Sequence, residues 1–186
     1  MDSLSLTTTT QHFTAMKNPN LSFLIISGPR GTNKSAVADH LTRRFSHRLV
    51  PVTSIVLGTA DKPVPKYPHL VAVTPEQYEI EEHTLVTRDE IDGVKYGTTS
   101  EALIWARQQG KIPVFRLRPE KAAEMQRQYG ALVHIIEIDN GDHSSTDPIM
   151  SFSFAGQVKN VYRARVIDGM MYEVDRVAAE VLEAIG

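Results

Sequence analysis

The sequence predicts an α/β protein in which a mainly parallel sheet lies between layers of helices. An apolar run at 21–27 is followed by a turn with two glycines and then by an amphipathic stretch. β-rich runs and helical patterns alternate from there to the C-terminus, which is typical of parallel strands joined by crossover helices. A β-rich stretch at 53–97 interrupts this alternation, and we interpret it as a small inserted subdomain.

Length and composition bound the class of protein. With 186 residues, 41% of them hydrophobic, the chain is long enough for one domain with a sizeable core. The net charge of −2 argues against a general nucleic-acid-binding protein, and no apolar run is long enough to span a membrane. The absence of cysteine excludes disulfides and fits a cytoplasmic protein. Residues 1–20 lack the segments of a secretion signal and are expected to form a flexible tail.

The first elements follow from apolar spacing and from proline. A helix is expected at 36–45, where apolar residues recur at every fourth position. The run 49–57 is rich in β-forming residues, and the proline-rich stretch 58–68 reads as a loop. A short strand is expected at 70–73. The acidic stretch 75–82 is predicted to be a helix with proline at its first position.

The middle of the chain carries turn and capping signals. The segment 85–96 is predicted to be a β-hairpin, because Asp92-Gly93 is a strong two-residue turn signal. The sequence Thr98-Thr-Ser-Glu101 has the pattern of a capping box and opens a helix that Gly110 ends. The predicted buried side of that helix consists of Ala102, Leu103, Trp105 and Ala106.

The last third continues the alternation. Strands are expected at 112–117 and 132–138, with a helix at 119–128 between them. The polar region 139–158 is expected to be lid-like, and a short strand is expected at 165–167. The final helix is predicted by an apolar stripe that consists of Val174, Val177, Ala178, Val181, Leu182 and Ile185.

The turn after the first strand reads Gly28-Pro-Arg-Gly-Thr-Asn-Lys-Ser35. Strand, glycine-rich turn, Lys-Ser and helix is the layout of a phosphate-binding loop, which predicts a three-layer P-loop NTPase fold. Backbone N–H groups of such a turn converge on one anion, and the helix N-terminus adds a partial positive charge. Lys34 would contact the phosphates of ATP, and the Ser35 hydroxyl would ligate Mg²⁺. The predicted phosphate-binding residues are Gly28, Gly31, Thr32, Asn33, Lys34 and Ser35.

The usual pattern has glycine before the lysine, whereas this chain has Asn33. Asparagine tolerates a positive φ better than most other residues, so we expect the loop to keep its shape. The alternative is a Gly/Asn turn that only joins a strand to a helix.

Several segments resemble the guanylate kinase family. The segment 25–35 resembles the opening of these enzymes, and 93–103 is similar to their Gly-Asn-Tyr-Tyr-Gly-Thr segment and the helix that follows it. The segments 109–115 and 165–185 resemble the next strand and the closing helix. The order of these segments is the same throughout.

The resemblance implies transfer of a phosphoryl group from ATP to a nucleotide or another phosphorylated small molecule, with Mg²⁺ between the charges. It implies that Lys34 is catalytic and that the insert 53–97 binds the acceptor. The acceptor-binding residues that it implies are Thr53, Tyr96 and Thr98, with Glu90 near the same pocket.

Three departures from the family concern charge. Guanylate kinases have Asp-x-Asp where this chain has Arg116-Leu-Arg118, and they have arginines where 56–63 and 139–158 have none. Positions 116 and 118 share one face of a strand, so both cations would face an anionic acceptor, or both would face solvent. Arg30, inside the phosphate loop, is a candidate catalytic replacement for the missing arginines.

Two functions therefore remain open. The first is a nucleotide kinase that uses ATP and Mg²⁺ and is weak or altered toward GMP. The second is a catalytically impaired binding module for a nucleotide, a phosphate or a phosphopeptide. An intact Lys-Ser pair favours the kinase, and the missing charge clusters favour the module.

Overall fold

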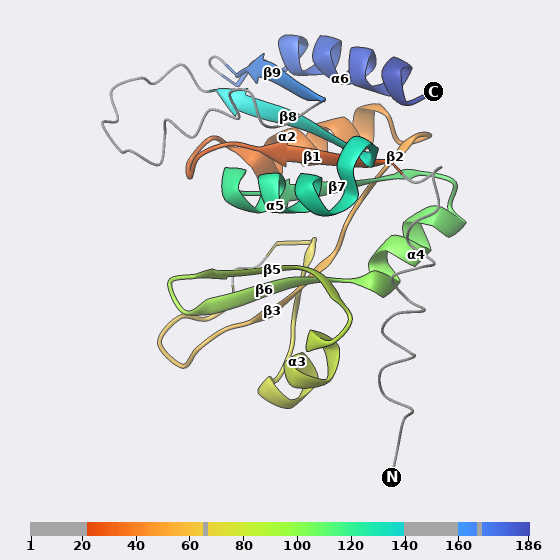
Figure 1. Cartoon of the computed structure of the whole chain (residues 1–186). Helices are drawn as coiled ribbons and strands as arrows, with labels where there is room; N and C mark the ends of the chain where they lie inside the picture. Colours follow the sequence, from red (N-terminus) through yellow and green to blue (C-terminus); the bar gives the residue numbers. More distant parts are fainter. Residues whose placement is uncertain (1–21, 65–66, 140–159, 167–168) are drawn as a thin grey trace. The chain divides into compact units, whose positions relative to one another are not determined.

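The computed structural model describes residues 22–64, 67–139, 160–166 and 169–186 (Figure 1). The predicted tail, 1–20, and the predicted lid-like region beyond Asp139 lie outside these residues. The described residues form two compact units. One is Thr53–Trp105, and the other combines Ser22–Val52 with Ala106–Gly186.

The second of these units contains a five-stranded sheet in which every neighbouring pair is parallel. The central strand, β1, is buried at all five of its residues, as expected for a strand covered on both faces. In spatial order the strands are β2 (Leu49–Pro51), β7 (Ile112–Leu117), β1 (Phe23–Ser27), β8 (Val133–Asp139) and β9 (Val161–Arg165).

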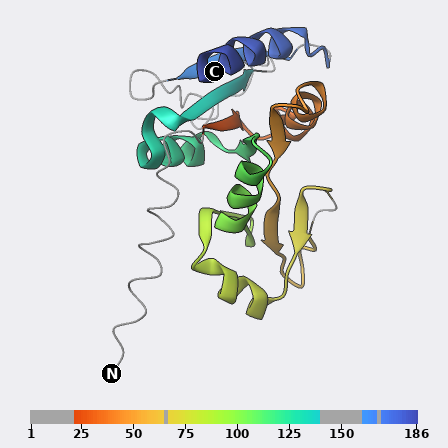
Figure 2. The ribbon, with the colours of Figure 1, turned by 90° about the vertical axis from the view of Figure 1, so that its right-hand side faces the viewer.

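Helices cover both faces of this sheet, so the predicted three-layer α/β arrangement is confirmed (Figures 1 and 2). Leu24 and Ile26 of β1 belong to one core cluster with the apolar sides of α2 (Lys34–Arg44) and α6 (Tyr172–Ile185). The opposite face packs on α5 (Pro119–Tyr129), where the ring of Phe23 lies 5.1 Å from that of Tyr129. Short 3₁₀ helix η1 (Gly130–Leu132) follows α5.

The final helix confirms the predicted stripe at all positions except Ile185, which is only partly buried. The buried residues of α6 are Val174, Val177, Ala178, Val181 and Leu182. This amphipathic face packs against β8 and β9, at the edge of the sheet (Figure 2). The position predicted for the preceding strand, 165–167, is wrong, because β9 spans Val161–Arg165.

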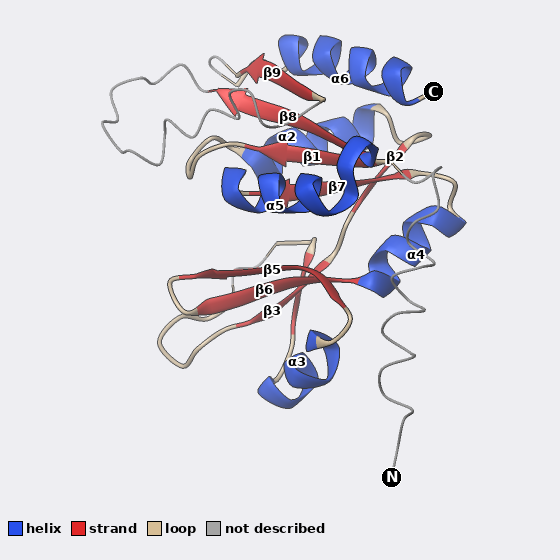
Figure 3. Cartoon of the chain, in the orientation of Figure 1, coloured by secondary structure: helices blue, strands red, loops and turns tan. Residues whose placement is uncertain are grey.

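The other unit contains a four-stranded sheet (Figure 3). The predicted hairpin is confirmed, because Asp92 and Gly93 have φ values of 54° and 82°, as a two-residue hairpin turn requires. In spatial order the strands are β4 (Leu70–Ala72), β3 (Ser54–Leu57), β6 (Val94–Thr99) and β5 (Leu85–Ile91). The unit also contains α3 (Pro75–Glu82) and most of α4 (Ser100–Gln108).

The β-rich run 49–57 forms two strands, β2 and β3, in different sheets. The amide of Val52 still donates to Val114 in the parallel sheet, whereas the amide of Ser54 donates to His69 in the other sheet. The chain therefore leaves one sheet for the other at Thr53.

Two expectations about α4 are also wrong. Its buried residues include Leu103 and Ala106, spaced by three, whereas Trp105 lies on another side of the helix and is 49% exposed. The first turn is capped by Thr99, whose hydroxyl accepts from the amide of Ala102 at 3.3 Å. Thr98, the expected cap, is a buried strand residue. Among the described residues, no helix is long and apolar enough to cross a membrane.

Candidate phosphate-binding site

The loop 28–33 leaves the carboxyl end of β1 between β7 and β8 and leads directly into α2. Position 28 requires glycine because neighbouring atoms leave no room for a side chain. A Cβ atom at this position would lie 2.8 Å from the carbonyl oxygen of Ile138 and 2.7 Å from the hydroxyl of Thr32. The edge where parallel strands end is where α/β proteins bind ligands, so the loop is at the expected place for a site.

Asn33 adopts the left-handed conformation, with φ 55° and ψ 30°, as the sequence predicted. Its side chain makes no capping hydrogen bond. The first helical bond of α2 runs from the amide of Val37 to the carbonyl of Asn33. The amides of residues 34–36 therefore have no acceptor within the helix, and such amides form the anion-binding end of a helix.

The Lys34 side chain folds back over the loop. Its Nζ donates to the carbonyl oxygens of Gly28 at 2.8 Å and Pro29 at 2.6 Å. The Pro29 carbonyl also accepts from the hydroxyl of Thr32 at 2.9 Å. An ammonium has three N–H groups, so this geometry leaves one for an anion while the other two fix its position.

The surroundings of Lys34 are electropositive. Burial lowers the pKa of its ammonium, and the positive charge of Arg118 lowers it further, while Glu120 acts in the opposite direction. Arg118 is the N-cap of α5, directly after β7. The charge of Arg118 thus acts on the phosphate loop, as its position at the end of a neighbouring strand implies.

Arg116 forms an ion pair that the sequence did not predict. Its Nη2 lies 2.5 Å from Oδ1 of Asp39, in α2, and its side chain is only 9% exposed. The alternative that Arg116 faces solvent is therefore wrong. Burial lowers the pKa of Arg116, and Asp39 opposes that shift. The Arg116 Nε is buried without a hydrogen-bond partner.

The donor set does not fit the Mg²⁺ ion predicted at Ser35. Mg²⁺ prefers oxygen ligands, commonly carboxylates and water. Asp39 follows Ser35 by four residues and so lies on the same helix face, but its carboxylate already binds Arg116. In the part of the chain that the structure describes, no group of three or more His, Cys, Asp or Glu side chains could hold a metal ion.

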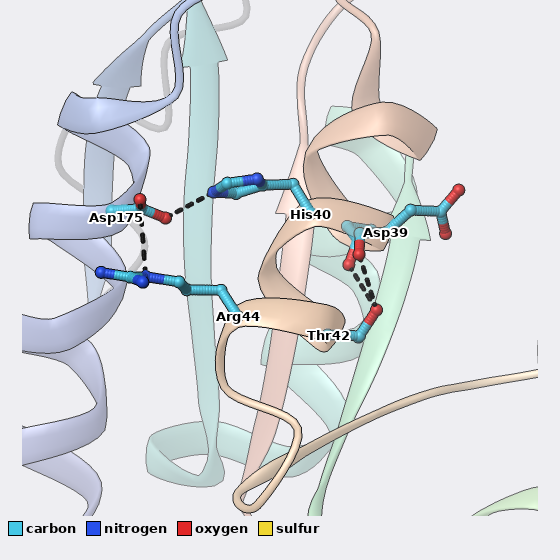
Figure 4. Close-up of polar contacts among 6 residues, drawn as sticks. Asp39, His40, Thr42, Arg44 and Asp175 are labelled. Atoms are coloured by element: carbon cyan, nitrogen blue, oxygen red, sulfur yellow. Dashed lines mark hydrogen bonds and ion pairs between the residues drawn. The ribbon is translucent and has the colours of Figure 1, made fainter.

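A second polar cluster joins α2 to α6 (Figure 4). Nε2 of His40 lies 2.6 Å from Oδ1 of Asp175, and Nε of Arg44 lies 3.9 Å from the other carboxylate oxygen. Asp175 is in the first turn of α6, where a negative charge is favourable. The cluster holds the helix that begins with Lys34 against the C-terminal helix.

Three of the predicted acceptor residues, Thr53, Tyr96 and Thr98, lie in the unit Thr53–Trp105, whereas Arg116 and Arg118 lie in the unit with the parallel sheet. Thr53 is exposed just before β3, whereas Tyr96 and Thr98 share one face of β6. The Thr98 hydroxyl lies 3.2 Å from that of Ser54, a residue that sequence reasoning missed. Since the two residues are far apart in the chain, only the strand pairing reveals the contact.

Glu90, which was expected near the acceptor pocket, does not share a face of the sheet with Tyr96. In the β5–β6 register Asp89 pairs with Tyr96, and Glu90 pairs with Lys95. Alternation along the strands therefore puts Asp89, and not Glu90, on the face that carries Tyr96.

The described architecture is a guanylate kinase-like P-loop fold. A solved structure with this fold is the guanylate kinase from Anaplasma phagocytophilum, with a TM-score of 0.61 and 16% sequence identity. The match covers 88% of this chain and 86% of that enzyme. No protein-family model matches the sequence, and no curated protein matches it. At this identity the likeness concerns the fold.

Proposed function

We propose that the loop 28–35 binds the phosphates of a nucleotide, with ATP as the first candidate. The observation that carries the proposal is the conformation of the loop. Asn33 takes the left-handed geometry that the usual glycine would take, and Lys34 is held over the loop by two carbonyls. Three helix-end amides and a fixed ammonium offer donors to one anion.

A thermal-shift titration tests this proposal. A ligand at about 100 times its Kd stabilises the folded protein by about 2.7 kcal/mol, so ATP should raise the Tm clearly. Lys34→Ala should abolish the shift. Lys121→Ala is the matched control, because Lys121 pairs with Glu124 on the exposed side of α5 and should not matter. Equal shifts in all three proteins would contradict a phosphate site at this loop.

We further propose phosphoryl transfer from ATP to a nucleoside monophosphate or another anionic acceptor, with weak or altered use of GMP. Support comes from the guanylate kinase-like fold and from a second unit that carries Tyr96 and Thr98 on one face. Incubation with ATP and a panel of nucleoside monophosphates, with and without Mg²⁺, would show diphosphates. Transfer to GMP at an ordinary kinase rate would contradict the altered specificity.

The alternative is a binding module without transfer. It is favoured by the Asp39–Arg116 pair, because a permanent cation stands where the family resemblance implies a carboxylate. Titration with ATP, inorganic triphosphate and a phosphopeptide distinguishes the ligands of such a module. Binding without any diphosphate product, across the whole acceptor panel, would favour the module over the kinase.

A further inference from the structure

We propose that the phosphate site takes a nucleoside polyphosphate as the free anion, with the cations of the protein in place of a divalent metal ion. The inference rests on the proposed binding of nucleotide phosphates at the loop 28–35. It goes further, because it states in which ionic form the ligand binds and which residues neutralise it.

The first step is the position of the cations. β7 is parallel to β1, and Arg116 pairs in register with Ile26, so the carboxyl ends of both strands meet at the phosphate loop. Arg118 follows directly, and its charge lowers the pKa of Lys34. Arg116, Arg118 and Lys34 thus bring three cationic groups to the start of α2, where the helix dipole adds a partial positive charge. Two carboxylates, those of Asp39 and Glu120, oppose them.

The second step is the buried guanidinium. Arg116 is more than nine-tenths buried and binds Asp39, one helical turn after Ser35, so it lies beside the first turns of α2. A guanidinium has five N–H donors, and the Nε of Arg116 has no partner. A buried donor without an acceptor is unfavourable, and a phosphate oxygen is an acceptor that would satisfy it.

The third step concerns the metal. The carboxylate on the Ser35 face of α2 is that of Asp39, and the guanidinium of Arg116 holds it. A divalent cation bound at Ser35 and Asp39 would lie close to the guanidinium of Arg116, which repels it. The guanidinium of Arg116 would instead attract a phosphate chain that carries no metal ion.

The test measures ATP binding to the full chain by calorimetry, once in EDTA and once in excess Mg²⁺. We expect the Kd for ATP in EDTA to equal or to be lower than that in Mg²⁺. A Kd at least tenfold higher in EDTA would overturn the inference and leave the proposed phosphate site intact. No binding in either condition, with Lys34→Ala unchanged, would overturn the proposed function itself.

A charge reversal provides the sharper variant. The double substitution Asp39→Arg with Arg116→Asp keeps an ion pair between α2 and β7 but moves the carboxylate to the strand. We expect it to weaken ATP binding in EDTA by at least tenfold and to restore binding when Mg²⁺ is added. Unchanged metal-free binding in a variant that circular dichroism shows to be folded would contradict the assigned role of Arg116.

Arg118→Gln keeps the proposal testable if the reversed pair does not fold, because Arg118 is only partly buried. We expect about tenfold weaker ATP binding in EDTA and a smaller loss in Mg²⁺. Arg127→Gln, in the last turn of α5, is the matched control and should bind as the unmodified protein does. Equal losses for Arg118→Gln in EDTA and in Mg²⁺ would contradict the replacement of the metal by protein cations.

Discussion

At the scale of single residues, Asn33 determines whether the loop keeps its shape. Its φ of 55° is strained for a residue with an ordinary side chain, and its own side chain makes no capping bond. We expect Asn33→Ala to lower the free energy of unfolding by about 1 kcal/mol and Asn33→Gly to change it by only a few tenths. Denaturant unfolding measures both. Equal losses for Ala and Gly would mean that the amide side chain, and not the backbone, matters here.

We expect His134 to make the stability of the protein depend on pH. It is 6% exposed in β8, its ring stacks on Tyr162, and its Nδ1 has no partner. Burial lowers the pKa of His134 below its ordinary value of 6.5. At acid pH the unfolded chain therefore binds a proton at His134 more tightly than the folded protein does. The free energy of unfolding consequently falls as the pH drops below about 6.5.

His134→Phe should remove this acid-side loss while it keeps the ring stacked on Tyr162. The protein with His134 should therefore lose more stability than the Phe variant when the pH falls from about 7.5 to about 5. Urea unfolding of both proteins at about pH 7.5 and about pH 5 measures it. Parallel pH dependences for the two proteins would show that His134 does not contribute.

At the scale of elements, the contact between His40 and Asp175 joins the helix of the phosphate loop to the C-terminal helix (Figure 4). Both side chains are partly exposed, so we expect a coupling free energy of about 1 kcal/mol or less in a double-mutant cycle with His40→Ala and Asp175→Ala. Glu173→Ala is a matched control, since it removes another first-turn carboxylate of α6. A similar coupling between His40 and Glu173 would assign the effect to the helix dipole.

Local signals in the sequence predicted most elements of the fold. Asp92 and Gly93 adopt the positive φ values of the predicted hairpin turn, and α6 buries most of its predicted apolar stripe. Both features were predictable because turn geometry and helical period depend on residues that are close together in the sequence. The split between β2 and β3 was not predictable in this way. Both halves have β-forming residues, and only the partner strands, which lie elsewhere in the chain, separate them.

In the candidate site, too, the local features were predictable from the sequence and the long-range contacts were not. The loop 28–35 is contiguous, so its geometry followed from glycine, asparagine and lysine at known spacing. Two contacts of the site join residues that are far apart in the sequence, Asp39 with Arg116 and Ser54 with Thr98. No rule based on sequence spacing predicts such contacts. Charge complementarity in the sequence would have been consistent with many other partners for Arg116.

At the scale of the whole molecule, the described residues pass from one unit to the other at two points. One passage is at Val52–Thr53 and the other at Trp105–Ala106, and the second lies inside α4. A helix that continues across a boundary cannot break there without the loss of its own backbone hydrogen bonds. We therefore expect the two units to unfold in one cooperative transition.

Trp105 makes this expectation measurable, because it is the single tryptophan of the chain and is half-exposed in the native protein. Its fluorescence and the far-ultraviolet circular dichroism should give the same denaturation midpoint, and two separate midpoints would contradict cooperative unfolding. Leu103→Ala, at a buried position two residues earlier in α4, should shift both midpoints together by a loss of about 2–5 kcal/mol. Trp105→Phe, followed by circular dichroism, should cost less than about 1 kcal/mol, because an exposed ring adds little packing.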